Sequence, residues 1–151
     1  IENGIFPTAV VEVGRSLRFS DTGKVRPFIE GRAGVETMVR GGFDLTIGRL
    51  GDGELMVRDP VTGLRYRSIS EQWSGYSFVL GADVAHVIDS DYFPEDRGVE
   101  VSDSRERVRA GVHWQNSDGA AAFYGLTWLG KEFEDQSDSQ IVGSIRFRIN
   151  F

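Results

Sequence analysis

The sequence contains no cysteine, so neither a disulfide framework nor a thiolate metal site can form. It has no run of about 18 apolar residues, so no membrane-spanning helix is expected. Its 4 prolines are scattered, and no linker or low-complexity segment divides the chain. The net charge of −6 argues against nucleic acid as a partner, because binding phosphates requires a basic face.

Glycine, in contrast, is abundant, with 19 residues spread along the chain. That distribution is typical of many strands joined by turns, and no segment shows the periodicity of an amphipathic helix. A length of 151 residues suits one domain, residues 1–151, with a core of its own. We therefore predict a single all-β domain.

The last twelve residues, 140–151, alternate between apolar and polar side chains, which predicts a strand. The apolar face holds Ile141, Ile145, Phe147, Ile149 and Phe151, and the polar face holds Gln140, Ser144, Arg146, Arg148 and Asn150. A terminal Phe closing such a strand resembles the signal by which the assembly machinery of bacterial outer membranes recognises barrels. Phe147, Ile149 and Phe151 would form that assembly signal.

The same alternation recurs upstream. It predicts strands at residues 8–19, 25–36, 43–49, 75–88, 105–116, 119–133 and 138–151, with two short arms at 55–58 and 64–68. Composition indicates turns at 20–23, 59–63 and 116–119, and polar surface loops at 89–104 and 132–139. The pairs Gly31/Gly34 and Gly41/Gly42 are expected at bends and turns rather than in phosphate-binding loops.

One face of these strands collects charges of both signs. We expect it to hold a network of Glu12, Arg18, Glu30, Arg32, Asp44, Arg105, Arg107, Arg109, Arg146 and Arg148. A soluble sandwich would leave all of these side chains in bulk water, whereas in a barrel they would pair in a hydrated lumen. The predicted strand lengths also match the ~9–11 residues that cross a bilayer better than the ~5–6 of soluble strands.

Aromatic residues at strand ends suit the interfacial girdles of a membrane barrel. They are Phe19, Trp73, Tyr76, Trp114, Trp128 and Phe151. We therefore predict an antiparallel transmembrane β-barrel in the outer membrane of a Gram-negative bacterium, in contact with outer-membrane lipid and lipopolysaccharide. A soluble sandwich or lipocalin-like binding barrel is the alternative.

The strand count is odd. The assembly signal places Phe151 on the periplasmic side, and seven strands traced back from it begin at the extracellular end. The two short arms add a pair, so the number stays odd, whereas a closed antiparallel barrel needs an even number. The chain also opens at Ile1 rather than at Met. We therefore expect at least one strand upstream of Ile1, or closure against another protein chain of a membrane assembly.

A family resemblance lies in residues 27–37, PFIEGRAGVET, and residues 42–48, GFDLTIG. These resemble the mid-chain strand pair of the lipid A 3-O-deacylase family of the LpxR type. Residues 75–93 and 126–136 are similar to the C-terminal half of that family, and Glu132-Phe133-x-x-Gln136 is the most specific element. Together the segments cover most of the chain. The resemblance implies the C-terminal portion of an outer-membrane barrel of about twelve strands.

The resemblance also implies calcium-dependent hydrolysis of the 3-O-acyl chain of lipid A. The catalytic Asn-Asp pair, hydroxyl residue and His with a nearby Glu belong to the family's N-terminal half. This sequence has no Asn-Asp dipeptide, and its asparagines are only Asn3, Asn116 and Asn150. No catalytic residue is carried over, and a non-enzymatic structural or interaction barrel remains the alternative.

The two histidines have no partners at a catalytic spacing. His113 falls on the charged face, and a general base there would need an orienting carboxylate and a nucleophile in reach, so we expect a structural histidine in the lumen. His86 falls on the apolar face near a strand end, where an interfacial histidine is ordinary. Three serines stand on predicted strands, Ser16, Ser77 and Ser144, but their spacing from histidine predicts no Ser-His-Asp triad.

Acidic residues cluster in the two polar loops. Carboxylates are ligands that calcium prefers, and the first loop holds Asp89, Asp91, Glu95 and Asp96. Their irregular spacing favours a solvated loop over a calcium site. The second loop holds Glu132, Glu134 and Asp135, which would join the first through divalent ions that bridge lipopolysaccharide phosphates.

Overall fold

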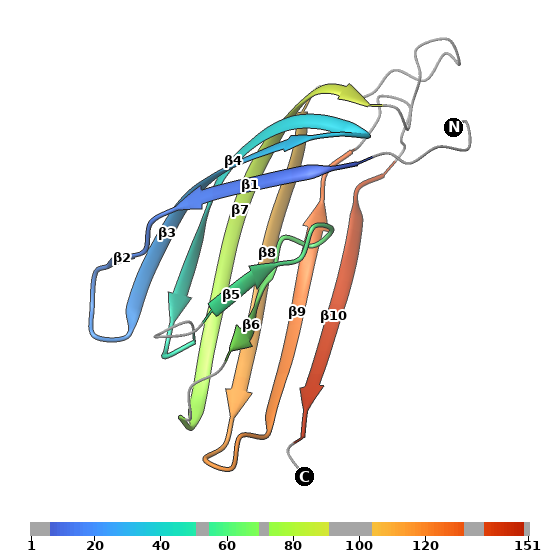
Figure 1. Cartoon of the computed structure of the whole chain (residues 1–151). Helices are drawn as coiled ribbons and strands as arrows, with labels where there is room; N and C mark the ends of the chain where they lie inside the picture. Colours follow the sequence, from blue (N-terminus) through green and yellow to red (C-terminus); the bar gives the residue numbers. More distant parts are fainter. Residues whose placement is uncertain (1–6, 51–54, 70–72, 91–103, 132–137, 150–151) are drawn as a thin grey trace.

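The computed structural model describes residues 7–50, 55–69, 73–90, 104–131 and 138–149 (Figure 1). The strands are β1 (Ala9–Gly14), β2 (Leu17–Arg18), β3 (Gly23–Ala33), β4 (Glu36–Ile47), β5 (Leu55–Arg58), β6 (Arg65–Ile69), β7 (Gly75–Ser90), β8 (Ser104–Gln115), β9 (Ala121–Leu129) and β10 (Gln140–Arg148). In these ranges the structure contains no helix long and apolar enough to cross a membrane. The all-β prediction is confirmed.

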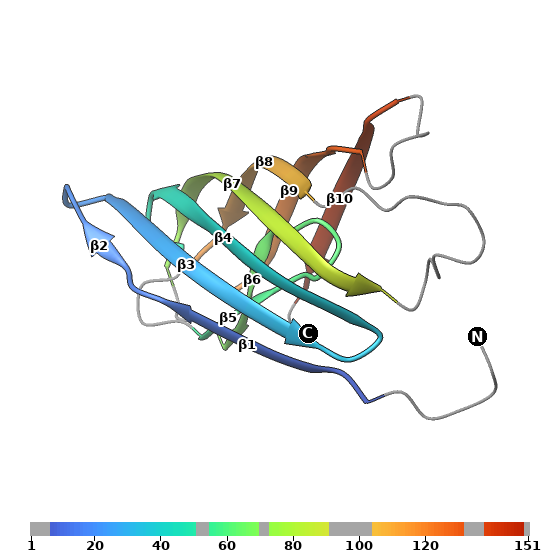
Figure 2. The ribbon, with the colours of Figure 1, turned by 90° about the horizontal axis from the view of Figure 1, so that it is seen from above.

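The strands form one antiparallel sheet in the order β1-β3-β4-β7-β8-β9-β10, with β2 also paired to β3. The order is that of the seven strands predicted from the sequence. The hairpin β5–β6 forms a separate two-stranded sheet. Figures 1 and 2 show that the large sheet is curved and that the hairpin lies on its concave side. β1 and β10 are the two edges of the path, and they do not pair with each other in the described part of the chain.

The first predicted strand, 8–19, is interrupted. Gly14 pairs with Phe28 and Leu17 pairs with Val25, so the register is the same on both sides of the gap. Between them Arg15 donates its N–H to the carbonyl of Pro27 at 3.2 Å. Pro27 has no N–H to return that hydrogen bond, and the ladder therefore breaks at this point.

The boundary between the next two strands was predicted wrongly. β3 ends at Ala33 and β4 begins at Glu36, so residues 25–36 are not one strand. Gly34 has a φ of 147°, a conformation that glycine adopts readily, and it forms the turn. Gly41 and Gly42 are therefore not a turn: they lie inside β4, opposite Val84 and Asp83 of β7.

The two faces of the sheet differ in chemistry. Side chains on the convex face are apolar and exposed, as at Phe78 (57%), Leu126 (44%) and Ile145 (66%). Side chains on the concave face are charged and buried, as at Asp83 (3%) and Arg109 (2%). A half-solvated antiparallel sheet in a soluble protein has the opposite arrangement, with the apolar face covered.

A glycine makes room for the charged side chains. A Cβ at Gly42 would overlap the backbone of Ala82 and Asp83, whereas a Cβ at Gly41 meets nothing within 4 Å. We expect Gly42→Ala to lower the free energy of unfolding by about 1–3 kcal/mol, because β4 and β7 must separate. Gly41→Ala should leave it unchanged or raise it by up to about 1 kcal/mol through the unfolded-state entropy. Urea unfolding followed by tryptophan fluorescence measures both, and equal losses would contradict this account of Gly42.

Candidate functional site

Asp83 is the centre of the charged concave face. Its two carboxylate oxygens accept a bidentate pair of hydrogen bonds from Arg107, at 2.9 and 3.1 Å, and a further one from Arg109. Nε of Arg40 lies 3.1 Å from Oδ1 of Asp83, at ion-pair distance but without hydrogen-bond alignment. Antiparallel pairing brings these groups together, because Asp83 stands opposite Arg107 on one side and Gly42 on the other.

Four more carboxylates extend this network over β1, β3, β4 and β8. Glu12 pairs with Arg26 and Arg58; Asp44 with Arg58 and Arg109; Glu30 with Arg32 and Arg40; and Glu36 with Arg32 and Arg105. Among the described residues, seven arginines thus share five carboxylates. Pairing of this kind is what allows charges to be buried, because an unpaired buried charge carries a large desolvation penalty.

The hairpin β5–β6 is joined to the network by Arg58. Its guanidinium bridges Glu12 and Asp44 and lies 3.7 Å above the ring of Phe28. Burial acts to lower the pKa of Arg58, but the hydrogen bonds that Arg58 donates to Asp44 and Glu12, together with the charges of these carboxylates, outweigh it and raise the pKa above its ordinary value. Arg58 is therefore charged at neutral pH.

The turn of the hairpin contacts the sheet through its backbone. The carbonyls of Pro60 and Val61 accept hydrogen bonds from Arg107 at 2.9 and 3.0 Å, and the carbonyl of Thr62 accepts one from Thr127 at 3.2 Å. Oδ1 of Asp59 holds the turn in shape by accepting hydrogen bonds from the N–H groups of residues 61 and 62. The hairpin is therefore an integral part of the concave face.

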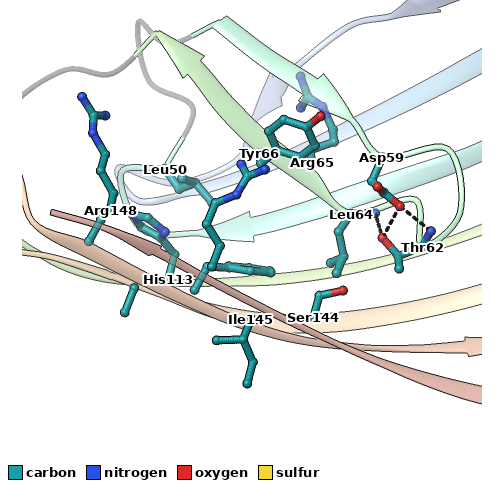
Figure 3. Close-up of a pocket in the computed structure, with 14 residues that line it drawn as sticks. Leu50, Asp59, Thr62, Leu64, Arg65, Tyr66, His113, Ser144, Ile145 and Arg148 are labelled. Atoms are coloured by element: carbon teal, nitrogen blue, oxygen red, sulfur yellow. Dashed lines mark hydrogen bonds between the residues drawn. The ribbon is translucent and has the colours of Figure 1, made fainter.

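A cavity of about 180 Å³ lies between the hairpin and strands β8, β9 and β10 (Figure 3). Leu50, Leu64 and Phe123 contribute apolar side chains to its lining. Arg146 lines it from β10, with its guanidinium carbon 3.9 Å from the ring centroid of Tyr66, a cation–π contact.

Arg65 and His113 also line the cavity. Burial, followed by repulsion from Arg26, lowers the pKa of Arg65 to about 10, so Arg65 is still charged at neutral pH. His113 is 6% exposed, and its ring centroid lies 5.6 Å from that of Trp73. The predicted position of His113 on the charged face is correct, as is that of His86 on the exposed apolar face.

Most of the residues expected in the charged network do meet there. They are Glu12, Glu30, Arg32, Asp44, Arg105, Arg107 and Arg109. Arg146 and Arg148 instead line the cavity, and Arg18 lies exposed on β2, where it donates a hydrogen bond to the carbonyl of Asp21. Phe147 and Ile149 of the expected assembly signal are exposed on the convex side, 73% and 67%, and Phe151 lies outside the described residues.

Five members of the network were not among the predicted residues: Arg26, Glu36, Arg40, Arg58 and Asp83. One aromatic residue was also misplaced. Arg40 was missed because Gly41 and Gly42 look like a turn, and Arg58 because it lies outside the main sheet. Asp83 did carry a signal, since it alternates with apolar neighbours in β7. Trp73 was predicted to lie in an interfacial girdle, but it is 5% exposed and contacts His113 on the inside.

The described residues contain no group of three His, Asp or Glu side chains that could hold a metal ion. The acidic candidates Asp91, Glu95, Asp96, Glu132, Glu134 and Asp135 lie outside the described residues, and so does the side chain of Asp89. Ser77 has a structural role, because its hydroxyl accepts a hydrogen bond from the N–H of Leu50 at 3.1 Å. The site as described holds paired charge and a cationic cavity.

Comparison with models of protein families, with curated proteins and with solved structures finds no match to this chain. Its function must therefore be argued from the geometry.

The shared carboxylate of Asp83 gives a direct test of the network. Asp83→Asn would leave three buried guanidinium groups without their common counter-charge, and we expect it to lower the free energy of unfolding by about 3–5 kcal/mol. The control is Asp21→Asn in the exposed turn before β3, which should change it by no more than about 0.5 kcal/mol. Urea unfolding is the measurement, and an Asp83→Asn protein as stable as the control would contradict the role given to this carboxylate.

Proposed function

We propose that this chain forms the wall of a transmembrane β-barrel in a bacterial outer membrane. The observation that carries the proposal is the inverted sheet, with paired, buried charges inside and exposed apolar side chains outside. In a soluble monomer the largest apolar patch is about 300–600 Å² and is itself often functional. Here exposed apolar side chains continue across every strand of the large sheet, including Val13, Ile29, Phe43, Leu80 and Ile145.

The height of the apolar band supports a bilayer as the surrounding medium. On β7 and β8 the convex face is apolar from Tyr76 and Trp114, which pair with each other, up to His86 and Glu106. The ten residue-to-residue steps from 76 to 86 span roughly 33 Å, which becomes about 25 Å at a tilt of roughly 40°. That is the height of the apolar band of outer-membrane barrels, and Tyr76 and Trp114 stand where an aromatic girdle is expected.

Closure of such a barrel requires further strands. Along the path of antiparallel strands, β1 and β10 run in the same direction. A barrel that is antiparallel at every seam therefore needs an odd number of additional strands between them. A second copy in the same membrane orientation does not meet this requirement, because both of its edge strands run in that direction too. We propose that additional strands complete the wall, and that the two of them that pair with β1 and with β10 run antiparallel to these strands.

Charge placed on the convex face distinguishes a lipid-facing from a water-facing sheet. Leu80 lies near the middle of the apolar band and Ile88 just beyond its end at His86, and both are exposed, 46% and 63%. We expect Leu80→Arg to destabilise the protein in a lipid bilayer by about 2–4 kcal/mol and Ile88→Arg by no more than about 1 kcal/mol. The measurement is urea unfolding from phosphatidylcholine vesicles. Two equally harmless substitutions, or full solubility without detergent, would support the soluble binding barrel instead.

Membership of the lipid A 3-O-deacylase family is a narrower proposal. It is supported by the resemblance of residues 27–37, 42–48, 75–93 and 126–136 to segments of that family. The same proposal includes calcium as the cofactor and lipid A as the substrate. Its competitor is a non-enzymatic barrel that acts as a structural or interaction protein. The dense ion pairing of the concave face favours the non-enzymatic barrel, because the charged side chains there pair with one another instead of facing a substrate.

Analysis of lipid A separates these two proposals. If the chain acts as a deacylase, outer membranes that contain it, supplied with calcium, should show lipid A lighter by one 3-O-linked acyl chain in mass spectra. Membranes from cells without the gene are the control. An unchanged acyl pattern in the presence of calcium would contradict the deacylase and leave the non-enzymatic barrel.

A further inference from the structure

We propose that the cavity between the hairpin β5–β6 and strand β10 binds an anionic group, a phosphate or carboxylate, attached to an apolar body. This ligand site goes beyond the role of the chain as a barrel wall. It does not depend on that role, because the same residues line the cavity whether the convex face meets lipid or water.

The described lining of the cavity holds more cationic than anionic side chains. Among the described residues, Arg65, Arg146 and Arg148 line it together with one carboxylate, that of Asp59. Asp59 is already engaged, because its Oδ1 accepts three hydrogen bonds from residues 61 and 62 of its own turn. The cavity-lining residues of β8 and β9 carry no carboxylate.

Arg146 has donors available for a ligand. In the described part of the chain it has no ion pair with a carboxylate; its recorded contact is with the ring face of Tyr66. A ring takes up only the flat face of a guanidinium and leaves the five N–H donors on its edge. That edge matches the geometry of a phosphate or carboxylate, which it binds through two parallel hydrogen bonds. The donors of Arg107 and Arg109, in contrast, are used by Asp83, Asp44 and the hairpin.

The remaining walls of the cavity select for an apolar body. Leu50 follows β4, Leu64 belongs to the hairpin and Phe123 belongs to β9. The space of about 180 Å³ is far above the ~10–15 Å³ that holds one water molecule. An anionic head with a short apolar portion therefore fits the lining better than a bare ion, and Tyr66 acts as a positioning residue that holds Arg146 toward the cavity.

Titration of the full chain with inorganic phosphate, in micelles of a neutral detergent, tests the site by isothermal calorimetry. We expect saturable binding that is weakened at least about tenfold, or about 1.4 kcal/mol, in Arg146→Gln. Arg15→Gln removes the same charge from an exposed position away from the cavity and should bind as the unaltered chain does. Tyr66→Leu should weaken binding severalfold, and Tyr66→Phe, which keeps the ring, should not.

The source of the anion is distinguished by repeating the titration in lipid nanodiscs. If a lipid head group fills the site, an anionic phospholipid in the disc will compete with phosphate, and phosphate will bind more weakly than in phosphatidylcholine discs. This difference between the two discs should be absent in Arg146→Gln. If a free anion fills it, binding will be the same in both discs. Absence of saturable binding would overturn the proposal. So would equal binding by Arg146→Gln and the unaltered chain, or equal losses in Arg146→Gln and Arg15→Gln.

Discussion

Burial of ionised side chains on the concave face is the constraint on which the rest of this structure depends. A buried guanidinium is tolerated only where a carboxylate and hydrogen bonds replace the water it has lost. Asp83 provides that replacement for arginines from two neighbouring strands at once, and the antiparallel register of β4, β7 and β8 sets their positions. A slip of one residue in any of these strands would turn its charges to the apolar face. The ion pairs therefore specify the register as well as stabilise the sheet.

The small residues of the concave face follow from the same constraint. A Cβ at Gly81 would come within 2.7 Å of the Arg109 side chain, and one at Gly125 within 2.8 Å of Leu64 in the hairpin. Large charged groups and an entire hairpin occupy the concave side only because their neighbours in the sheet are small. The abundance of glycine thus reflects packing against the hairpin and the arginines, as well as turns such as that at Gly34.

Much of the fold was predictable, because a period of two is a local property of the sequence. The alternation around Arg105, Arg107 and Arg109 placed these residues on one face of one strand, and the structure agrees. The failures are non-local. Nothing near Gly41 and Gly42 indicates that they pair with Val84 and Asp83 of β7, so a strand interior was taken for a turn. Arg58 joins Glu12, 46 residues away, through a hairpin whose position depends on contacts that no periodicity encodes.

The hairpin explains how the concave face is satisfied without an opposing sheet. In an open barrel, water would hydrate the inward-facing charges. Excluding that water would impose a desolvation penalty on each charge that has no other partner. Here the carbonyls of Pro60 and Val61 accept the hydrogen bonds that Arg107 would otherwise donate to water. Arg58 forms ion pairs with both Glu12 and Asp44 and so neutralises charge between them. The hairpin forms hydrogen bonds with β1, β4, β8 and β9, whereas toward β10 it contacts Arg146 through the ring of Tyr66 and borders the cavity. Arg146 lies at that cavity, and its guanidinium is held by the ring of Tyr66.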